Sequence, residues 1–295
     1  MASGVTILDG GMGRELLRMG APFRQPEWSA LALMEAPELV GRAHRAFLDA
    51  GAQIVTTNSY ALVPFHIGPE RFAAQGQALA ELAGRIARDA ADEHGGGAGI
   101  AGSLPPLFGS YRPDLFDPEV APDLLRTLVA GLSPHVDLWL GETLSATAEA
   151  AVIRQVLGSD RRPLWLSFTL ADELTDGRAR LRSGEHVARA AAEARALGAA
   201  ALLFNCSPPE VMAAAIGEAA TALAGSRMRL GAYANAFAGT GRSAANAGLS
   251  PLRTDTGPVR YLELACSWAA AGASVIGGCC GIGPEHIREL ATSLG

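Results

Sequence analysis

Residues 200–207 read AALLFNCS, an apolar run that ends in an asparagine, a cysteine and a serine. An Ala-, Glu- and Arg-rich stretch, SGEHVARAAAEARALG (183–198), precedes this run, and a second apolar run, PLWLSFTL (163–170), precedes that stretch. Near-continuous apolar runs are typical of parallel strands that are buried on both faces. A serine and a carboxylate at the start and a glycine at the end are typical boundaries of a helix. Residues 163–207 therefore predict a strand, a helix and a second, parallel strand.

The same alternation extends along the whole chain. The other apolar runs are VTILDG (5–10), AQIVTTNSY (52–60), AGIAGSL (98–104), DLWLGET (137–143), MRLGAYAN (228–235) and SVIGGCC (274–280). Further helical stretches are APELVGRAHRAFLDAG (36–51), QALAELAGRIARDAADEH (77–94) and GPVRYLELACSWAAAG (257–272). About eight strand–helix units predict an α/β protein with a (β/α)₈ barrel, and a doubly wound open sheet is the alternative. Because the composition shows no break, we expect residues 1–295 to form a single barrel domain.

The composition argues against several classes of function. Hydrophobic residues make up 49% of the chain and charged residues 18%, as in globular proteins. The net charge of −6, with no block of basic residues, argues against a nucleic-acid partner. No stretch approaches the roughly 18 apolar residues of a membrane span, and the N-terminal residues resemble no secretion signal. We therefore expect a cytoplasmic protein without a membrane partner; the sequence leaves its oligomeric state open.

The cysteines stand in informative places. Cys206 ends the sixth apolar run, and the adjacent Cys279 and Cys280 end the eighth. Strands six and eight are near neighbours around a barrel, so Cys206 can approach the pair. Three converging thiolates suit Zn²⁺, whose catalytic sites keep three protein ligands and an open fourth position. The alternative is a tight turn with one buried and one exposed thiol. Cys266 falls within the predicted helix 257–272, where we expect a small buried hydrophobic residue.

Polar side chains also gather at strand ends, where barrel enzymes place their chemistry. Asp9 ends the first predicted strand, Asn58 the second, Glu142 the fourth, Asn205 the sixth and Tyr233 the seventh. From the residues alone, each also has a purely structural interpretation. Asp9 and Glu142 suit a turn or a helix start, and the others suit strand-end hydrogen bonding or core packing.

Five motifs occur in a characteristic order. They are DGGMG (9–13), GAQIVTTNSY (51–60), GET (141–143), FNCS (204–207) and GGCCG (277–281). Together they resemble the homocysteine S-methyltransferase family of zinc-dependent barrels, which includes betaine– and S-methylmethionine–homocysteine methyltransferases. The resemblance extends from about Leu8 to Ile287.

This resemblance implies that Cys206, Cys279 and Cys280 bind Zn²⁺ as thiolates. The metal would deprotonate the thiol of homocysteine and hold it as a nucleophile that attacks an activated methyl group, giving methionine. The sequence does not distinguish homocysteine from a related thiol or selenol.

The resemblance also assigns substrate-binding roles. Asp9 and Glu142 would hold the amino acid end of the substrate, since carboxylates are strong acceptors for an ammonium group. From the residues themselves, the backbone amides of Gly10 and Gly11 can approach the substrate, because glycine has no Cβ in the way. Asn58 and Asn205 would orient ligands or loops, and Tyr233 would lie near the zinc ion.

We expect the methyl donor to be a sulfonium, either S-methylmethionine or S-adenosylmethionine. Its positive charge suits a site rich in thiolates and carboxylates, and Phe23, Trp28 and Tyr60 are candidates for aromatic contacts with it. The sequence does not rank the two donors. Two alternative functions are a zinc-binding barrel without methyl transfer and a redox protein in which Cys279 and Cys280 form a vicinal disulfide.

Three positions depart from the family pattern. Arg14 stands where family members often have threonine, and Ile282 and Gly283 stand where two threonines often follow GGCCG. The stretch after the seventh strand, YANAFAGTGRSAAN (233–246), also lacks the expected proline and acidic residue. These departures concern the methyl-donor pocket and the tail of the acceptor, and they leave the three cysteines unchanged.

Overall fold

The computed structural model describes residues 4–237 and 251–295, and its central feature is an eight-stranded parallel sheet. The strand order is β1-β8-β7-β6-β5-β4-β3-β2, and every neighbouring pair is parallel. A parallel bridge between Leu8 and Ile54 joins the two ends of this order, and the Asp9 amide donates to the Ile54 carbonyl at 3.1 Å. The sheet therefore closes into the predicted (β/α)₈ barrel, and the doubly wound alternative is wrong.

The elements follow the predicted alternation. The strands are β1 (Thr6–Ile7), β2 (Ile54–Thr56), β3 (Gly99–Leu104), β4 (Leu138–Leu144), β5 (Leu164–Phe168), β6 (Ala201–Asn205), β7 (Arg229–Ala234) and β8 (Val275–Gly278). The helices are α1 (Met12–Arg18), α2 (Ser29–Glu35), α3 (Pro37–Asp49), α4 (Pro64–Ile67), α5 (Pro69–His94), η1 (Pro113–Leu115), α6 (Ala121–Leu132), α7 (Thr147–Leu157), α8 (Val187–Ala196), η2 (Pro209–Val211), α9 (Met212–Ala222), α10 (Pro258–Ala270) and α11 (Pro284–Leu294). Most strands are shorter than the apolar runs that predicted them, because the last residues of several runs leave the sheet and enter the loops that carry the polar side chains.

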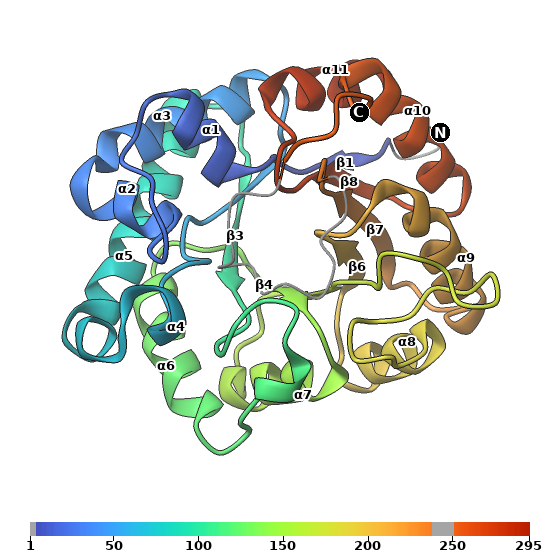
Figure 1. Ribbon diagram of the computed structural model, residues 1–295, viewed down its shortest axis with the longest axis horizontal. Coiled ribbons are helices and arrows are strands. Elements are labelled where there is room, and N and C mark those ends of the chain that lie inside the picture. Colours follow the sequence, from blue (N-terminus) through green and yellow to red (C-terminus); the bar gives the residue numbers. More distant parts are fainter. Residues whose placement is uncertain (1–3, 238–250) are drawn as a thin grey trace.

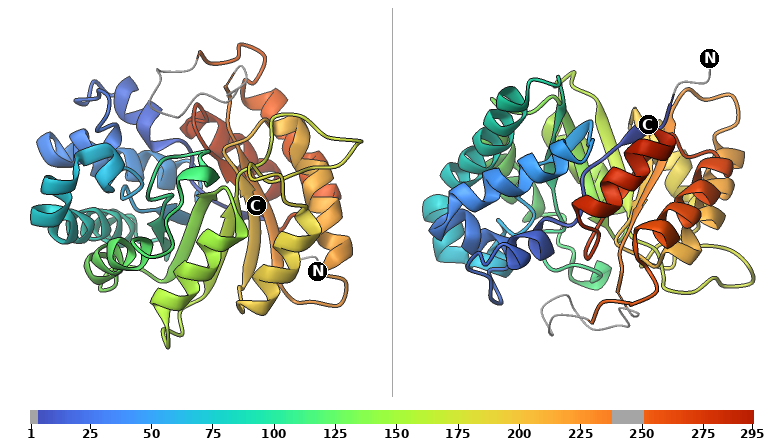
Figure 2. Two further views of the ribbon diagram at one scale, coloured as in Figure 1. Left: turned by 60° about the horizontal axis from the view of Figure 1, so that its bottom comes forward. Right: turned by 90° about the horizontal axis from the view of Figure 1, so that it is seen from above.

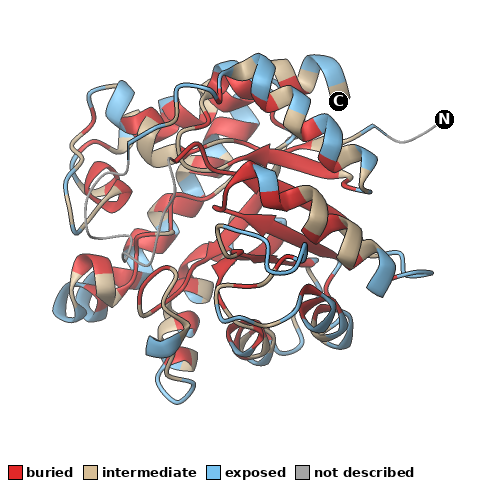
Figure 3. Cartoon of the chain, turned by 45° about the vertical axis from the view of Figure 1, so that its right-hand side comes forward, coloured by how far each residue is buried: buried red, intermediate tan, exposed pale blue. Residues whose placement is uncertain are grey.

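The helices form a ring around the sheet (Figures 1 and 2). Most strand residues are buried, and the long outer helices are buried on one side and exposed on the other (Figure 3). On α3, for example, the buried residues include Val40, Ala43 and Phe47, which recur at helical spacing. None of the helices within residues 4–237 and 251–295 combines the length and the apolar character that crossing a membrane requires.

Two hydrophobic clusters divide the core. The larger fills the layer between strands and helices, and the smaller, which includes Leu140, Trp165, Leu203 and Tyr233, lies inside the barrel. Side chains alternate between these clusters along a strand because successive residues point to opposite faces. The barrel interior is thus packed below the rim where the strands end.

One core prediction was wrong. Cys266 was expected to be buried, but its side chain is exposed on α10. The buried residues of that helix are Tyr261, Ala265 and Trp268, which set the inward face. Cys266 lies about 100° around the helix axis from Ala265, so it points away from that face.

Tyr261 ties α10 to the ends of β7 and β8. Its buried hydroxyl donates to the Gly277 carbonyl at 2.8 Å and accepts from the Ala234 amide at 3.1 Å. Replacing it with phenylalanine leaves both backbone groups without this partner, which costs about 1–3 kcal/mol of unfolding free energy. We expect this loss for Tyr261→Phe in urea denaturation. As a control, Thr292→Val removes an exposed hydrogen bond on α11 and should change the free energy of unfolding by less than about 0.5 kcal/mol. Equal losses of stability in the two variants would contradict the role assigned to the Tyr261 hydroxyl.

Candidate metal and substrate site

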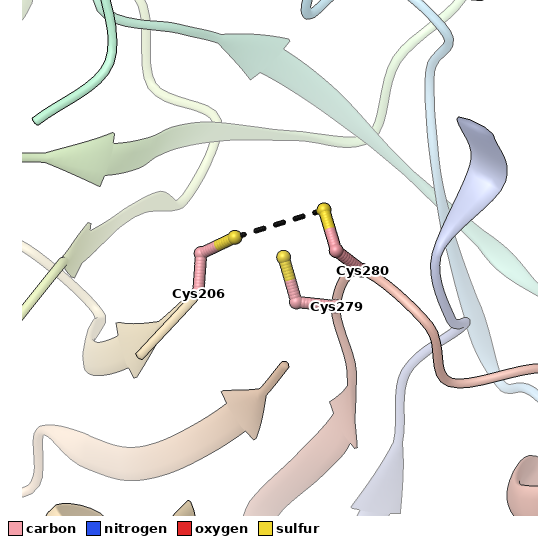
Figure 4. Close-up of side chains that lie close together, drawn as sticks. All are labelled: Cys206, Cys279 and Cys280. Carbon is pink, nitrogen blue, oxygen red and sulfur yellow. Dashed lines mark hydrogen bonds between the residues drawn. The ribbon is translucent and has the colours of Figure 1, made fainter. Parts of the chain in front are cut away.

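The structure brings three cysteines together at the rim where the strands end. Their side chains point toward one another from the ends of β6 and β8 (Figure 4). The sulfur atoms of Cys206, Cys279 and Cys280 all lie within 4.8 Å of one another, and those of Cys206 and Cys280 are 3.8 Å apart. The predicted approach of the sixth strand to the eighth is therefore present, with β7 between them.

Cys206 is held in an unusual backbone conformation directly after β6. Its φ of +50° lies in the left-handed region, which residues with a Cβ adopt rarely. Its amide donates to the Tyr233 carbonyl at 3.2 Å, and the hydroxyl of Tyr111 lies 3.4 Å from its carbonyl oxygen. These contacts hold the turn that directs the sulfur toward the other two cysteines.

Cys279 and Cys280 share a tight turn that follows β8. The Cys279 amide donates to the Ala234 carbonyl at 2.9 Å, and the Ile282 amide donates back to the Cys279 carbonyl at 3.0 Å. Gly281 has a φ of +85°, a conformation that glycine adopts without strain. Because the strand has already ended at Gly278, the two side chains are released from the alternation that would otherwise place them on opposite faces.

The three sulfurs fit a tetrahedral metal ion. A Zn²⁺ ion with Zn–S bonds of about 2.3 Å requires its sulfur ligands to be about 3.8 Å apart. The separation between Cys206 and Cys280 is 3.8 Å, and Cys279 lies within 4.8 Å of both. Three cysteines also leave the fourth position open for a ligand.

Hydrogen bonding among the three thiols shifts their pKa values in different directions. Bonds from Cys279 and Cys280 lower the pKa of Cys206 well below its ordinary value, and the Tyr111 hydroxyl, which donates to its sulfur at 3.1 Å, adds to the effect against burial. The same bonding to Cys206 raises the pKa of Cys279 and of Cys280. Hydrogen bonding therefore acts in opposite directions on the pKa of Cys206 and on the pKa values of its two neighbours.

The cysteines lie in the wall of a cavity of about 360 Å³. Its lining also includes the predicted residues Asp9, Gly10, Gly11, Asn58, Glu142 and Tyr233. The aromatic candidates Phe23, Trp28 and Tyr60 line it as well. A cavity of this size falls at the lower end of the range for small-molecule sites, about 300–1,000 Å³.

Two buried carboxyl groups lie in this cavity. Asp9 accepts from the Thr56 amide at 2.7 Å and from the Thr56 hydroxyl at 3.2 Å, and Glu142 accepts from the Ser103 hydroxyl. Burial raises the pKa of Asp9 to about 7, against the lowering effect of Thr56. Burial also raises the pKa of Glu142 to about 8, with smaller contributions from the charges of Asp9 and Cys206. A cation placed beside the two carboxyl groups would lower their pKa values and so favour their ionised forms.

The two glycines of the DGG motif have a packing role. A Cβ on Gly10 would lie 2.4 Å from the Ile282 carbonyl oxygen, and one on Gly11 would lie 2.5 Å from that of Cys279. The Gly11 amide donates to the Ile282 carbonyl at 2.8 Å, so this N–H is already used inside the protein. We expected both amides to approach the substrate; the structure leaves the Gly10 amide as the better candidate.

Asn205 and Asn58 organise the backbone around the cavity. The Asn205 side chain accepts from the Thr143 amide at 2.9 Å and from the Ser167 hydroxyl at 2.7 Å, and it donates to the Thr143 hydroxyl at 2.8 Å. Asn205 is not in the cavity lining, so a positioning role fits it better than ligand contact. Asn58 lines the cavity and donates to the Ser29 carbonyl at 3.1 Å.

Tyr233 presents a polar group toward the site. Its side chain lines the cavity above the inner core, and its buried hydroxyl lies near Glu142 and Ser167 without a hydrogen bond of ordinary geometry to any described residue. A buried hydroxyl of this kind is suited to contact a ligand.

Several site residues were not predicted from the sequence. Tyr111 contacts the Cys206 sulfur from the loop after β3. The guanidinium carbon of Arg182 lies over the Tyr111 ring, 4.9 Å from the ring centre. Thr56 and Ser103 hold the two carboxylates from neighbouring strands. Only the position of Thr56 and Ser103 at the ends of apolar runs could have indicated them; nothing in the sequence near Tyr111 indicates its role.

The departures from the family pattern separate into two groups. The Ile282 side chain is buried against Gly278, where an added Cβ would lie 2.2 Å from it, and Gly283 precedes α11. Neither lines the cavity, whereas Arg14 does. The stretch 233–246 lies partly in residues 238–250, outside the described residues.

Comparisons with known proteins agree with the fold and the motifs. A model of the homocysteine S-methyltransferase family matches residues 6–294. The chain is 28% identical to Homocysteine S-methyltransferase 1 of Zea mays, covering 99% of this chain and 95% of the relative. It is 29% identical to Homocysteine S-methyltransferase YbgG of Bacillus subtilis, covering 97% of this chain and 93% of that relative. The crystal structure of the metallated form of the homocysteine methyltransferase MmuM from Escherichia coli superimposes on this chain with a TM-score of 0.79 at 28% identity. The match covers 99% of this chain and 96% of MmuM.

The buried Glu142 carboxyl should make stability depend on pH. Its pKa is raised to about 8 in the folded state from the ordinary value of 4.5, chiefly by burial, so its contribution to stability is complete below about pH 4.5 and is lost as the pH rises to about 8. We expect metal-free Glu142→Gln to gain stability relative to the wild type across this window, by a few kcal/mol at most. Urea denaturation at pH 5, 6.5 and 8 tests this.

The control is Glu81→Gln, since Glu81 is exposed on α5. Its pH profile should run parallel to that of the wild type. A parallel profile for Glu142→Gln as well would contradict the assigned pKa shift.

Proposed function

The chain belongs to the homocysteine S-methyltransferase family, and on that premise we propose that it transfers a methyl group from a sulfonium donor to homocysteine bound at a zinc ion, giving methionine. Family membership establishes the enzyme class, a methyltransferase that acts on homocysteine. The metal, the residues and the donor are the proposal. We treat residues 1–295 as one homocysteine-binding barrel domain, which the family match over residues 6–294 supports.

The observation that carries the proposal is the convergence of three sulfurs. Cys206, Cys279 and Cys280 would hold the ion as thiolates, and the 3.8 Å separation between two of the sulfurs supports a tetrahedral site. A bound Zn²⁺ would deprotonate the substrate thiol and keep its sulfur nucleophilic at neutral pH. Tyr111 would hold the Cys206 sulfur in place through its hydroxyl.

The carboxylates would bind the amino group of homocysteine. Asp9 is fixed by Thr56 and Glu142 by Ser103, so both acceptors are oriented before the substrate arrives. An ammonium group between them would offset the cost of ionising two buried carboxyls, whose pKa values are raised by burial. The Gly10 amide and the Tyr233 hydroxyl are further candidates for substrate contact, and Asn58 and Asn205 position the surrounding loops.

The charge and size of the cavity favour a compact sulfonium donor. Thiolates and carboxylates supply negative charge, and Phe23, Trp28 and Tyr60 supply aromatic faces that attract a cation. The volume of about 360 Å³ must hold homocysteine together with the donor. We therefore propose S-methylmethionine ahead of S-adenosylmethionine, which carries an adenosyl group in addition.

Loss of one cysteine ligand should abolish both metal binding and turnover. Substitutions of residues that only support the metal ligands typically lower metal affinity about 10- to 100-fold. Because Cys280→Ser removes a ligand itself, we expect a larger loss of zinc affinity. Zinc content of reduced protein, read beside methionine formation from homocysteine and S-methylmethionine, provides the measurement. Cys266→Ser is the matched control, because Cys266 is exposed on α10.

The outcomes separate the candidate functions. About one zinc per chain with turnover, both lost in Cys280→Ser, supports the proposal. Zinc without turnover from any sulfonium donor would point to a metal-binding barrel without methyl transfer. Reduced wild-type protein without zinc would refute the metal site and leave the vicinal-disulfide alternative.

Removing the negative charge of Asp9 should weaken homocysteine binding selectively. Asparagine keeps an acceptor for Thr56 but loses the charge-assisted bond to the ammonium group, so we expect the KM for homocysteine to rise about 10-fold or more. Steady-state kinetics with each substrate varied separately tests this. Asp92→Asn, at an exposed position, is the control; an Asp9→Asn variant with an unchanged homocysteine KM would contradict the assigned role.

A further inference from the structure

Arg14 brings a positive charge to a cavity that is otherwise rich in acidic groups. It lies on α1, which begins directly after Gly11, and its side chain lines the cavity. It is the one arginine or lysine in that lining within residues 4–237 and 251–295.

The acidic groups already have a proposed partner of opposite charge. Asp9 and Glu142 suit an ammonium group, and the three cysteines suit a metal ion. The carboxylates of the two amino acid substrates remain, and these require donors. The backbone amide of Gly10 lies next to Asp9, one of the two carboxylates beside which homocysteine would bind. It can therefore serve the carboxylate of homocysteine.

Arg14 lies beside the aromatic part of the wall. Its guanidinium carbon is 5.9 Å from the centre of the Phe237 ring. The backbone next to it packs closely on Phe23, because a Cβ on Gly13 would lie 3.2 Å from the Phe23 ring. Phe23 in turn meets Trp28 edge to face, with ring centres 5.6 Å apart. These aromatic side chains are the part of the lining that the proposed function assigns to the donor.

Arg14 and the three cysteines line the same cavity. Thiolates attract the positive sulfonium, whereas the guanidinium repels it and attracts a carboxylate. A donor with both groups is therefore oriented with its sulfonium toward the sulfurs and its carboxylate toward Arg14.

We propose that Arg14 binds the carboxylate of the methyl donor and selects sulfonium donors that carry one. A guanidinium can grip a carboxylate through two parallel hydrogen bonds, which fix orientation as well as affinity. The inference rests on the proposed methyl transfer and adds a specificity-determining residue to it.

The test compares each donor with its decarboxylated form. S-methylmethionine is paired with (3-aminopropyl)dimethylsulfonium, and S-adenosylmethionine with its decarboxylated analogue. We expect wild-type kcat/KM to favour the carboxylate donor by about 10- to 100-fold, and Arg14→Thr to lose most of this preference. The homocysteine KM and the zinc content should remain as in the wild type.

Two further variants control for charge and folding. Arg14→Lys keeps the charge without the planar fork and should retain part of the preference. Arg126→Thr removes an exposed arginine on α6 whose partner, Asp123, is also exposed, and it should leave the preference unchanged. Thermal unfolding of each variant checks that the barrel is intact.

Three results would overturn the role of Arg14 alone. They are an unchanged donor preference in both Arg14 variants, a raised homocysteine KM with an unchanged donor KM, and a loss of zinc in Arg14→Thr. Wild-type enzyme loaded with zinc that forms no methionine from either carboxylate donor would instead refute the proposed function, and the Arg14 proposal with it.

Discussion

The contact between the first and last strand ends is the constraint on which the site depends. Gly278 donates to the Asp9 carbonyl at 2.9 Å, and Gly11 donates to the Ile282 carbonyl at 2.8 Å. Neither Gly10 nor Gly11 has space for a Cβ against the turn that carries Cys279 and Cys280. The same contact thus helps close the barrel, places Asp9 on the rim and supports the cysteine pair. A larger residue at either glycine would separate the two turns and disturb all three features together.

Backbone strain is concentrated around the cavity. The described non-glycine residues with positive φ are Trp28, Tyr111, Thr143, Asp176 and Cys206. All but Asp176 line the cavity. Such conformations cost about 1–3 kcal/mol each and persist only where neighbouring contacts enforce them. Here Asn205 holds Thr143 through its backbone and side chain, which explains an asparagine whose own side chain lies outside the cavity.

The sequence predicted the parts of the site that follow from strand periodicity. Apolar runs located the strands, and their polar last residues located Asp9, Glu142 and the three cysteines, because parallel strands end at one rim. Tyr111 and Arg182 could not be found this way, since loops without a regular period bring them together. Cys266 was misplaced because an alanine-rich helix does not define its inward face from composition; large buried residues such as Tyr261 and Trp268 define it.

The site divides into a floor and a wall with different origins. The floor is built from strand ends, where barrel closure fixes the positions of the cysteines and carboxylates. The wall comes from the residues after β1 and β7, which supply Phe23, Arg14 and Phe237. The changes at Ile282 and Gly283 lie behind the floor, and the change at Arg14 lies in the wall. Because the wall does not hold the barrel closed, substitutions in it should leave the arrangement of the three cysteines unchanged.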